Sequence, residues 1–316
     1  MKRYFKLAIL LSLSTFLLIA CSNEKPKTTN DGKLVIYTTL YPLEYFANRI
    51  GGDDVQAESI IPPGSDAHSF EPTTKTMTKL AEADLFIYNG AGMEGFAEAA
   101  KETLQNEDVT VLESAKGIHL DESHEEHEKH VNENAHDGHD HGDINPHIWI
   151  DPILAIQQAE NIKNTLVELS PEKKDTFDTN FEALKRDLLK IDESFKQMVK
   201  SVPKKEFLIS HDAYSYWEKR YGLDQLSVSG LSPSQEPTQK QLEDIIQTAE
   251  DHHLTYMLFE QNATPKPAKA VQHELGLKTL RIHNLSVLTE EDLANDETYL
   301  TLMERNIETL RKALSE

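Results

Sequence analysis

Cysteine is nearly absent from this sequence, because Cys21 is the only one in 316 residues. A single cysteine cannot form an internal disulfide, so the fold has to be held by packing and hydrogen bonds. Basic residues are also scarce, with 32 Lys and Arg against 54 Asp and Glu and a formal net charge of −22. Such a surface repels nucleic acid and anionic membranes, which excludes electrostatic binding to either.

Long apolar runs are confined to the first 20 residues. Lys2, Arg3 and Lys6 precede the apolar run 7–19, which ends in Leu-Ile-Ala-Cys at Cys21. This layout predicts a secretory signal peptide, 1–20, since the apolar core is shorter than the roughly 20 residues that span a bilayer. The end of the run resembles a bacterial lipobox, so we expect Cys21 to be lipidated and to anchor the protein on the extracytoplasmic face of the cell membrane. An ordinary signal peptide with an incidental cysteine is the alternative.

The polar residues 21–32 are expected to form a flexible tether. Beyond the tether, short β-branched runs alternate with helix-length segments, the pattern of βαβ units with parallel sheets. The expected strands span 34–40, 55–61, 84–89 and 109–112 in the first half, and 207–210, 225–228, 255–260 and 278–282 in the second. The sequence therefore predicts an α/β fold of two lobes, at 33–170 and 203–316.

A segment without glycine or internal proline, 171–202, joins the expected lobes. Its apolar residues recur in alternating steps of four and three, which form one stripe on a helix: Phe177, Phe181, Leu184, Leu188, Ile191, Phe195, Met198 and Val202. Ser170 and Pro171 are expected as its N-cap and first helical residue. A helix of about 30 residues is about 45 Å long and can run along both lobes. The stripe also permits a coiled-coil dimer, but we favour packing on the lobes of a monomer.

Histidine and acidic residues fill 119–143, with almost no apolar content to form a core, so a mobile loop is expected. The histidines of this loop are His119, His124, His127, His130, His136, His139 and His141. We expect them to collect Zn²⁺ or similar cations loosely. The spacing between His124 and His127 does not match the His-Glu-x-x-His motif of zinc proteases.

Three other histidines lie in ordered segments. His68 follows the second expected strand, His211 follows the fifth, and His147 lies where the histidine-rich loop rejoins ordered structure. Ligands of open α/β sheets gather at the carboxyl ends of strands, where His68 and His211 are expected. A lone histidine at a strand end is more often structural. Three of them beside a metal-collecting loop favour a metal site.

Four motifs resemble the zinc-type solute-binding lipoproteins of ABC metal importers, the cluster A-I family of high-affinity zinc uptake. The motifs are Pro-Pro-Gly-Ser-Asp-Ala-His-Ser-Phe-Glu-Pro at 62–72, Asn-Pro-His-Ile-Trp-Ile-Asp-Pro at 145–152, Ile-Ser-His-Asp-Ala-Tyr at 209–214 and Ser-Gly-Leu-Ser-Pro-Ser-Gln-Glu-Pro at 229–237. The resemblance covers about 33–316. It implies two lobes joined by a long rigid helix, with Zn²⁺ as cargo in the cleft, bound by His68, His147 and His211. It also implies a non-enzymatic protein that delivers zinc to a permease and its ATPase.

One position departs from that family pattern. Many relatives supply a carboxylate ligand after the last core strand, where this chain has Ser286 in the stretch 283–286. Water is the expected fourth ligand, with His283 as the alternative. Manganese is the alternative cargo, because other members of the wider family carry it, although they place a carboxylate where His211 stands and oxygen ligands favour Mn²⁺. A catalytic zinc site and a host-surface adhesin are the rival functions.

Overall fold

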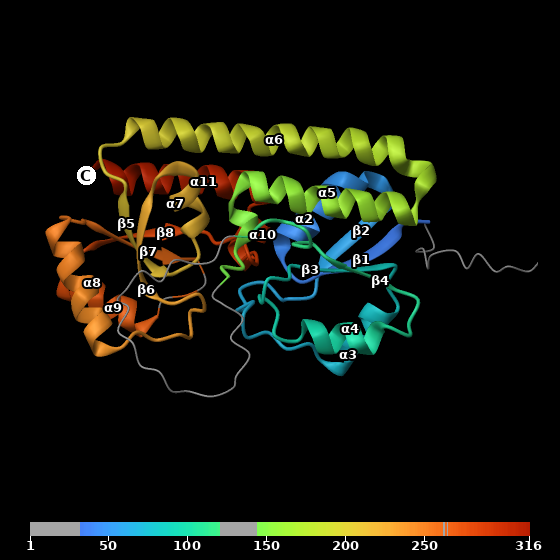
Figure 1. The fold of residues 1–316 in the computed structure, drawn as a ribbon, viewed down its shortest axis with the longest axis horizontal. Coiled ribbons are helices and arrows are strands. Elements are labelled where there is room, and N and C mark those ends of the chain that lie inside the picture. The colour runs from blue at the N-terminus through green and yellow to red at the C-terminus, as the bar shows by residue number, and fades with distance from the viewer. Residues whose placement is uncertain (1–31, 121–143, 262, 264) are drawn as a thin grey trace, which may run out of the picture.

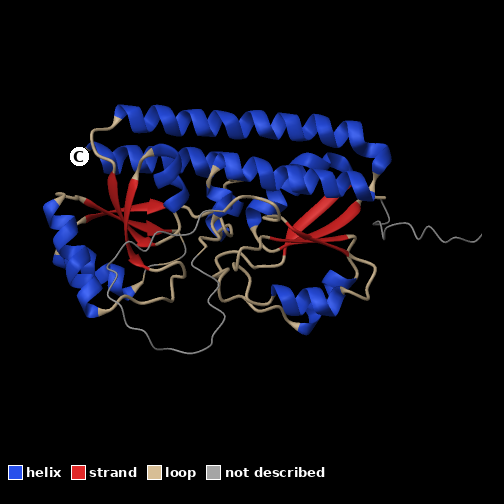
Figure 2. Ribbon diagram, viewed as in Figure 1, coloured by secondary structure: helices blue, strands red, loops and turns tan. Residues whose placement is uncertain are grey.

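Two four-stranded parallel sheets lie at opposite ends of the molecule (Figure 1). The computed structural model describes residues 32–120, 144–261, 263 and 265–316. Figure 2 shows helices on both faces of each sheet. The prediction of two α/β lobes with parallel sheets is therefore confirmed.

The first sheet has the order β2-β1-β3-β4 and the second has the order β6-β5-β7-β8. The strands of the first are β1 (Leu34–Thr38), β2 (Val55–Ser59), β3 (Leu85–Tyr88) and β4 (Thr110–Glu113), connected by α2 (Tyr41–Gly51), α3 (Thr74–Ala81) and α4 (Ala97–Leu104). The strands of the second are β5 (Glu206–His211), β6 (Asp224–Ser229), β7 (Tyr256–Glu260) and β8 (Lys278–Ile282), connected by α7 (Ser215–Tyr221), α8 (Gln239–Asp251) and α9 (Lys266–Glu274). Helices α10 (Glu290–Ala294) and α11 (Tyr299–Ser315) complete the chain.

In each sheet the first strand along the chain lies between the second and the third. The connections that leave neighbouring strands then run in opposite directions, which opens a crevice at the carboxyl ends of the strands. Strands β3 and β7 are buried along their whole length, and apart from Glu260 at the end of β7 their residues are apolar or aromatic rather than alternating with polar ones. In each lobe, ligands are therefore expected beside the carboxyl end of the strand that comes first along the chain.

The helix α6 (Lys174–Ser201) runs along both lobes, and α5 (Pro152–Leu169) lies beside it over the first lobe (Figure 1). The predicted apolar stripe of α6 is buried against α2 and α5 on the first lobe and against α7 and α11 on the second. The long helix between the lobes is therefore confirmed. Its stripe is covered by helices of the same chain, so packing on the lobes accounts for it without a coiled-coil partner.

The start of this helix differs from the prediction. Ser170 makes no side-chain cap, and its backbone N–H donates to the carbonyl of Leu166 at the end of α5. Pro171 begins a 3-10 turn, Pro171–Lys173, that leads into α6. The reason is that the chain has to reverse between α5 and α6. Proline, which has a fixed φ and no N–H, fits the first position of that short turn.

One cluster of buried apolar side chains includes residues of both sheets together with α2, α5, α6 and α11. An apolar interface that large opposes free relative motion of the lobes. In the part of the chain that the structure describes, no helix combines the length and the apolarity required to cross a membrane.

Candidate metal centre

His68 lies in the loop that follows β2, and it is partly exposed. Asp66 shapes this loop, because its Oδ1 accepts the backbone N–H of His68 at 3.1 Å and its Oδ2 accepts the Ser69 hydroxyl at 2.6 Å. Gly64 has a φ of +73°, and its N–H donates to the carbonyl of Leu288 at 2.8 Å. The loop of the first lobe is thus tied to the loop after β8 in the second.

His147 precedes a short 3-10 turn, Ile148–Ile150, and is almost fully buried. The Oδ1 atom of Asn145 accepts from the backbone N–H of His147 at 2.9 Å and lies 2.7 Å from its Nδ1. An amide oxygen can only accept, so Nδ1 carries the proton and Nε2 keeps its lone pair. Asn145 is itself held by the second lobe, where its Nδ2 donates to the Ser215 hydroxyl and its carbonyl accepts from Tyr216.

His211 is the last residue of β5 and is also almost fully buried. Its Nδ1 lies 2.9 Å from Oε1 of Glu260, and its Nε2 lies 2.8 Å from the carbonyl oxygen of Leu231. Both partners are acceptors, so the imidazole is held with a proton on each nitrogen. A metal ion would have to displace the Nε2 proton and the Leu231 contact.

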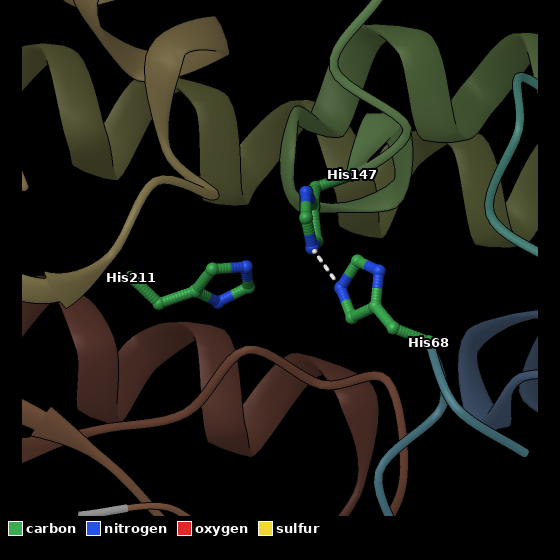
Figure 3. A group of neighbouring side chains, drawn as sticks. All are labelled: His68, His147 and His211. Carbon is green, nitrogen blue, oxygen red and sulfur yellow. Dashed lines mark hydrogen bonds between the residues drawn. The ribbon is translucent and has the colours of Figure 1, made fainter. Parts of the chain in front are cut away.

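The structure brings these three imidazoles together (Figure 3), with one potential ligand atom from each within 4.8 Å of the others. The Nε2 atoms of His68 and His147 are 3.1 Å apart, and the ring of His211 lies 4.8 Å and 5.5 Å from the rings of His147 and His68. Nitrogen ligands of a tetrahedral Zn²⁺ lie about 3.3 Å apart, from Zn–N distances of about 2.0–2.1 Å. Across residues 32–120 and 144–316, apart from 262 and 264, no other group of three potential ligands meets this condition.

Burial and mutual repulsion set the charge of the cluster. Burial, followed by repulsion from His211, lowers the pKa of His68 to about 4, and the same causes hold the pKa of His147 well below its ordinary value. Burial also lowers the pKa of His211, but attraction to Glu260 and their hydrogen bond outweigh it and raise that pKa overall. Two imidazoles are therefore neutral and ready to ligate, whereas the third competes with a proton.

Other predicted residues lie elsewhere. His283 is buried outside the cluster, where its Nε2 lies 3.0 Å from Oδ2 of Asp292 and its Nδ1 accepts from the Leu285 N–H at 2.9 Å. The Ser286 hydroxyl donates to Oδ1 of Asn284 at 2.8 Å. His119 is exposed and is not part of the cluster. Cys21 and the other loop histidines lie outside the described residues: His124, His127, His130, His136, His139 and His141.

The sequence interpretation missed Glu260, Asn145 and Leu231 as partners of the imidazoles. Glu260 ends β7, the strand next to β5. Its position at the carboxyl end of an expected strand could have marked it as a residue near the site. Asn145 was visible only as part of a motif. Leu231 contributes a backbone carbonyl, which no side-chain pattern indicates.

Comparison with known proteins gives consistent matches. The family described as zinc-uptake complex component A, periplasmic (ZnuA) matches residues 36–313. The high-affinity zinc uptake system protein ZnuA of Bacillus subtilis (strain 168) is 33% identical over 304 residues, which cover 95% of this chain and 94% of that protein. The zinc-binding lipoprotein AdcA of Streptococcus pneumoniae (strain R6) is 33% identical over 308 residues, or 97% of this chain. The chain spans about 60% of the length of that streptococcal protein.

A solved structure shows the same architecture. The crystal structure of the Zn(II)-bound ZnuA-like domain of Streptococcus pneumoniae AdcA matches with a TM-score of 0.74 and 30% sequence identity. The match covers 90% of this chain and all of that domain.

Proposed function

The chain belongs to the family of periplasmic zinc-uptake component A proteins, and from that membership we propose that it captures Zn²⁺ outside the cytoplasm and delivers it to an ABC permease for import. The observation that carries the proposal is the convergence of His68, His147 and His211 from three distant chain segments. Neutral imidazoles are good ligands for Zn²⁺. A binding protein with a solute as its cargo, not an enzyme, is the role proposed.

The position of the three residues supports a clamp between the lobes. His68 belongs to the first lobe, His211 ends a strand of the second, and His147 is held through Asn145 to α7 of the second. A metal bound to all three stabilises the arrangement in which the lobes approach each other. Release then requires a change that separates the ligands, and docking to the permease, with its ATPase, is the proposed cause.

We propose three protein ligands and a water molecule as the fourth. His283 is a poor fourth ligand, because both of its ring nitrogens are already hydrogen-bonded to Asp292 and Leu285. A metal would have to break both the buried pair with Asp292 and the turn at Leu285. Ser286 offers only a hydroxyl, which is engaged with Asn284.

The proposed organisation of the chain follows the sequence prediction. A signal peptide, 1–20, is removed, and lipidated Cys21 with the tether 21–32 attaches the protein to the outer face of the cell membrane. The N-terminal lobe is 33–170, the linking segment is 171–202, in which the helix α6 spans Lys174–Ser201, and the C-terminal lobe is 203–316. The histidine-rich loop, 119–143, collects metal, and the protein acts as a monomer.

Competition between metals tests the proposal. Purified wild-type protein should bind one Zn²⁺ tightly, and an equal concentration of Mn²⁺ should not displace it, because an all-imidazole site is poor for an ion that prefers oxygen. Displacement by equimolar Mn²⁺ would instead assign manganese as the cargo. The absence of any tight metal site would overturn the proposal as a whole.

A further inference from the structure

We propose that Glu260 is a positioning residue of the metal centre, whose carboxylate holds His211 for ligation through Nε2 and supplies negative charge against the bound dication. The inference rests on the proposed zinc-binding function and adds a residue that sets its affinity. Glu260 ends β7 and His211 ends β5. These strands pair in parallel with Ile209 opposite Leu258, so both side chains leave the sheet together at its carboxyl edge.

The surroundings of Glu260 fit a fixed negative charge. The side chain is 1% exposed, and both carboxylate oxygens accept hydrogen bonds. Oε1 lies 2.9 Å from Nδ1 of His211 and accepts the Tyr214 hydroxyl at 3.1 Å, while Oε2 accepts Nδ2 of Asn284 at 3.0 Å. Burying an ionised carboxylate is costly unless donors surround it, and here donors reach both oxygens.

Charge balance makes this carboxylate important. Three neutral imidazoles carry no charge, so they leave a bound Zn²⁺ doubly positive in a site where His147 and His211 are each 1% exposed. A carboxylate that accepts from the far nitrogen of a ligating imidazole orients the ring and raises its basicity. Ser286 stands where the family pattern has a ligating carboxylate. In this chain the compensating charge therefore acts through His211 rather than on the metal directly.

Asp66 does not provide this charge in the same way. It is exposed, and it accepts from the backbone N–H of His68 rather than from the imidazole. Solvent and salt screen an exposed carboxylate. The buried Glu260 is screened far less, so its charge acts on the centre at nearly full strength.

The test compares the zinc affinity of full-length wild-type protein with that of Glu260→Gln, Glu260→Asp and Glu94→Gln by competitive titration at pH 8. Glu260→Gln keeps an acceptor for Nδ1 but removes the charge, and it should weaken zinc binding roughly 10–100-fold. Glu260→Asp keeps the charge and should recover part of this loss. Glu94→Gln is the matched control. Glu94 is also buried and accepts from the N–H groups of Asn89 and Gly90, but it contacts no imidazole of the cluster. The zinc affinity of the Glu94→Gln variant should therefore stay close to that of the wild-type protein.

A spectroscopic measurement does not depend on the variants folding. Long-range ¹H–¹⁵N spectra of the zinc-loaded wild-type protein should show His211 protonated at Nδ1 and ligated through Nε2. Ligation through Nδ1 would overturn the inference, as would wild-type affinity in a folded Glu260→Gln protein or equal losses in the Gln and Asp variants.

The His68→Ala variant distinguishes the role of Glu260 from the proposed zinc capture. If it removes the tight site while Glu260→Gln does not, only the role of Glu260 fails, whereas a wild type without a tight site refutes zinc capture itself.

Discussion

The Nε2 atoms of His68 and His147 lie 3.1 Å apart, although the two residues are 79 positions apart in the chain. His147 is fixed by Asn145, which holds its Nδ1 proton and leaves the Nε2 lone pair facing His68. One of the two facing nitrogens must donate to the other. A metal ion replaces that shared proton with bonds to both nitrogens, at a separation only slightly larger than the present one. The spacing and orientation of this pair support the proposed metal centre.

The number of protein ligands can be counted by substitution. His68→Ala, His147→Ala and His211→Ala should each weaken zinc binding more than His283→Ala or Ser286→Ala, because only the first three remove a ligand. Competitive zinc titration of the five variants, in a background without the histidine-rich loop, measures this difference. An effect of His283→Ala equal to that of His147→Ala would mean that the site has four protein ligands.

Zinc affinity should fall as pH decreases, and His211 should set the range. Its pKa is raised above the ordinary value by Glu260, whereas the pKa of His68 is lowered to about 4 and that of His147 is also lowered, so His211 is the first of the three to bind a proton as the pH falls. Protonated imidazole cannot ligate. Below about pH 6.5, and above the range near pH 4 where His68 is protonated as well, the affinity should therefore decrease about tenfold per pH unit, the signature of one competing proton. Zinc titrations across this range measure the slope, and a slope of three protons centred near pH 6.5 would contradict it.

The histidine-rich loop should raise zinc stoichiometry without forming the transport site. Deleting residues 119–142 should remove weakly bound zinc and leave one tight site, because ordering a polar segment around a metal costs conformational entropy. Metal analysis and zinc titration of the deletion variant test this. If the tight site disappears while His68, His147 and His211 are intact, the site has been misplaced.

Lipidation at Cys21 should determine membrane attachment. A Cys21→Ala variant should remain unprocessed or appear in the medium, since a lipobox without its cysteine cannot be lipidated. Fractionation of expressing cells, with the wild-type protein as the control, measures the distribution. Detergent-requiring membrane association of a variant whose signal peptide has been removed would argue against a lipid anchor at this position.

Two adjacent leucines on α6 offer a matched test of its packing. Leu188 is fully buried, whereas Leu189 is 43% exposed. Leu188→Ala should lower the free energy of unfolding by about 2–5 kcal/mol through a cavity between the helix and the lobes. Leu189→Ala should change it by no more than about 0.5 kcal/mol. Urea unfolding of the metal-free proteins compares them, and equal effects would show that α6 does not pack as described.

The sequence alone was sufficient for the architecture because the relevant signals are local. Apolar runs with helix-length gaps predicted the strands of both sheets, and the four-three periodicity of 171–202 predicted the long helix. The same periodicity could not place the start of that helix. Whether Pro171 begins α6 or a separate turn depends on the reversal from α5, which is a relationship between two helices.

The candidate ligands also came from local signals, since His68 lies after one recognisable strand and His211 lies at the end of another. What the sequence could not provide was the set of partners for each imidazole nitrogen. Asn145 and Glu260 contact histidines only after the chain has folded, and Leu231 acts through its backbone. The sequence left His283 open as a fourth metal ligand. Its buried contacts with Asp292 and Leu285 make that role unfavourable. Periodicity and residue type thus determined the elements and the chemistry, whereas hydrogen bonds between distant segments decided which nitrogens are free to bind a metal.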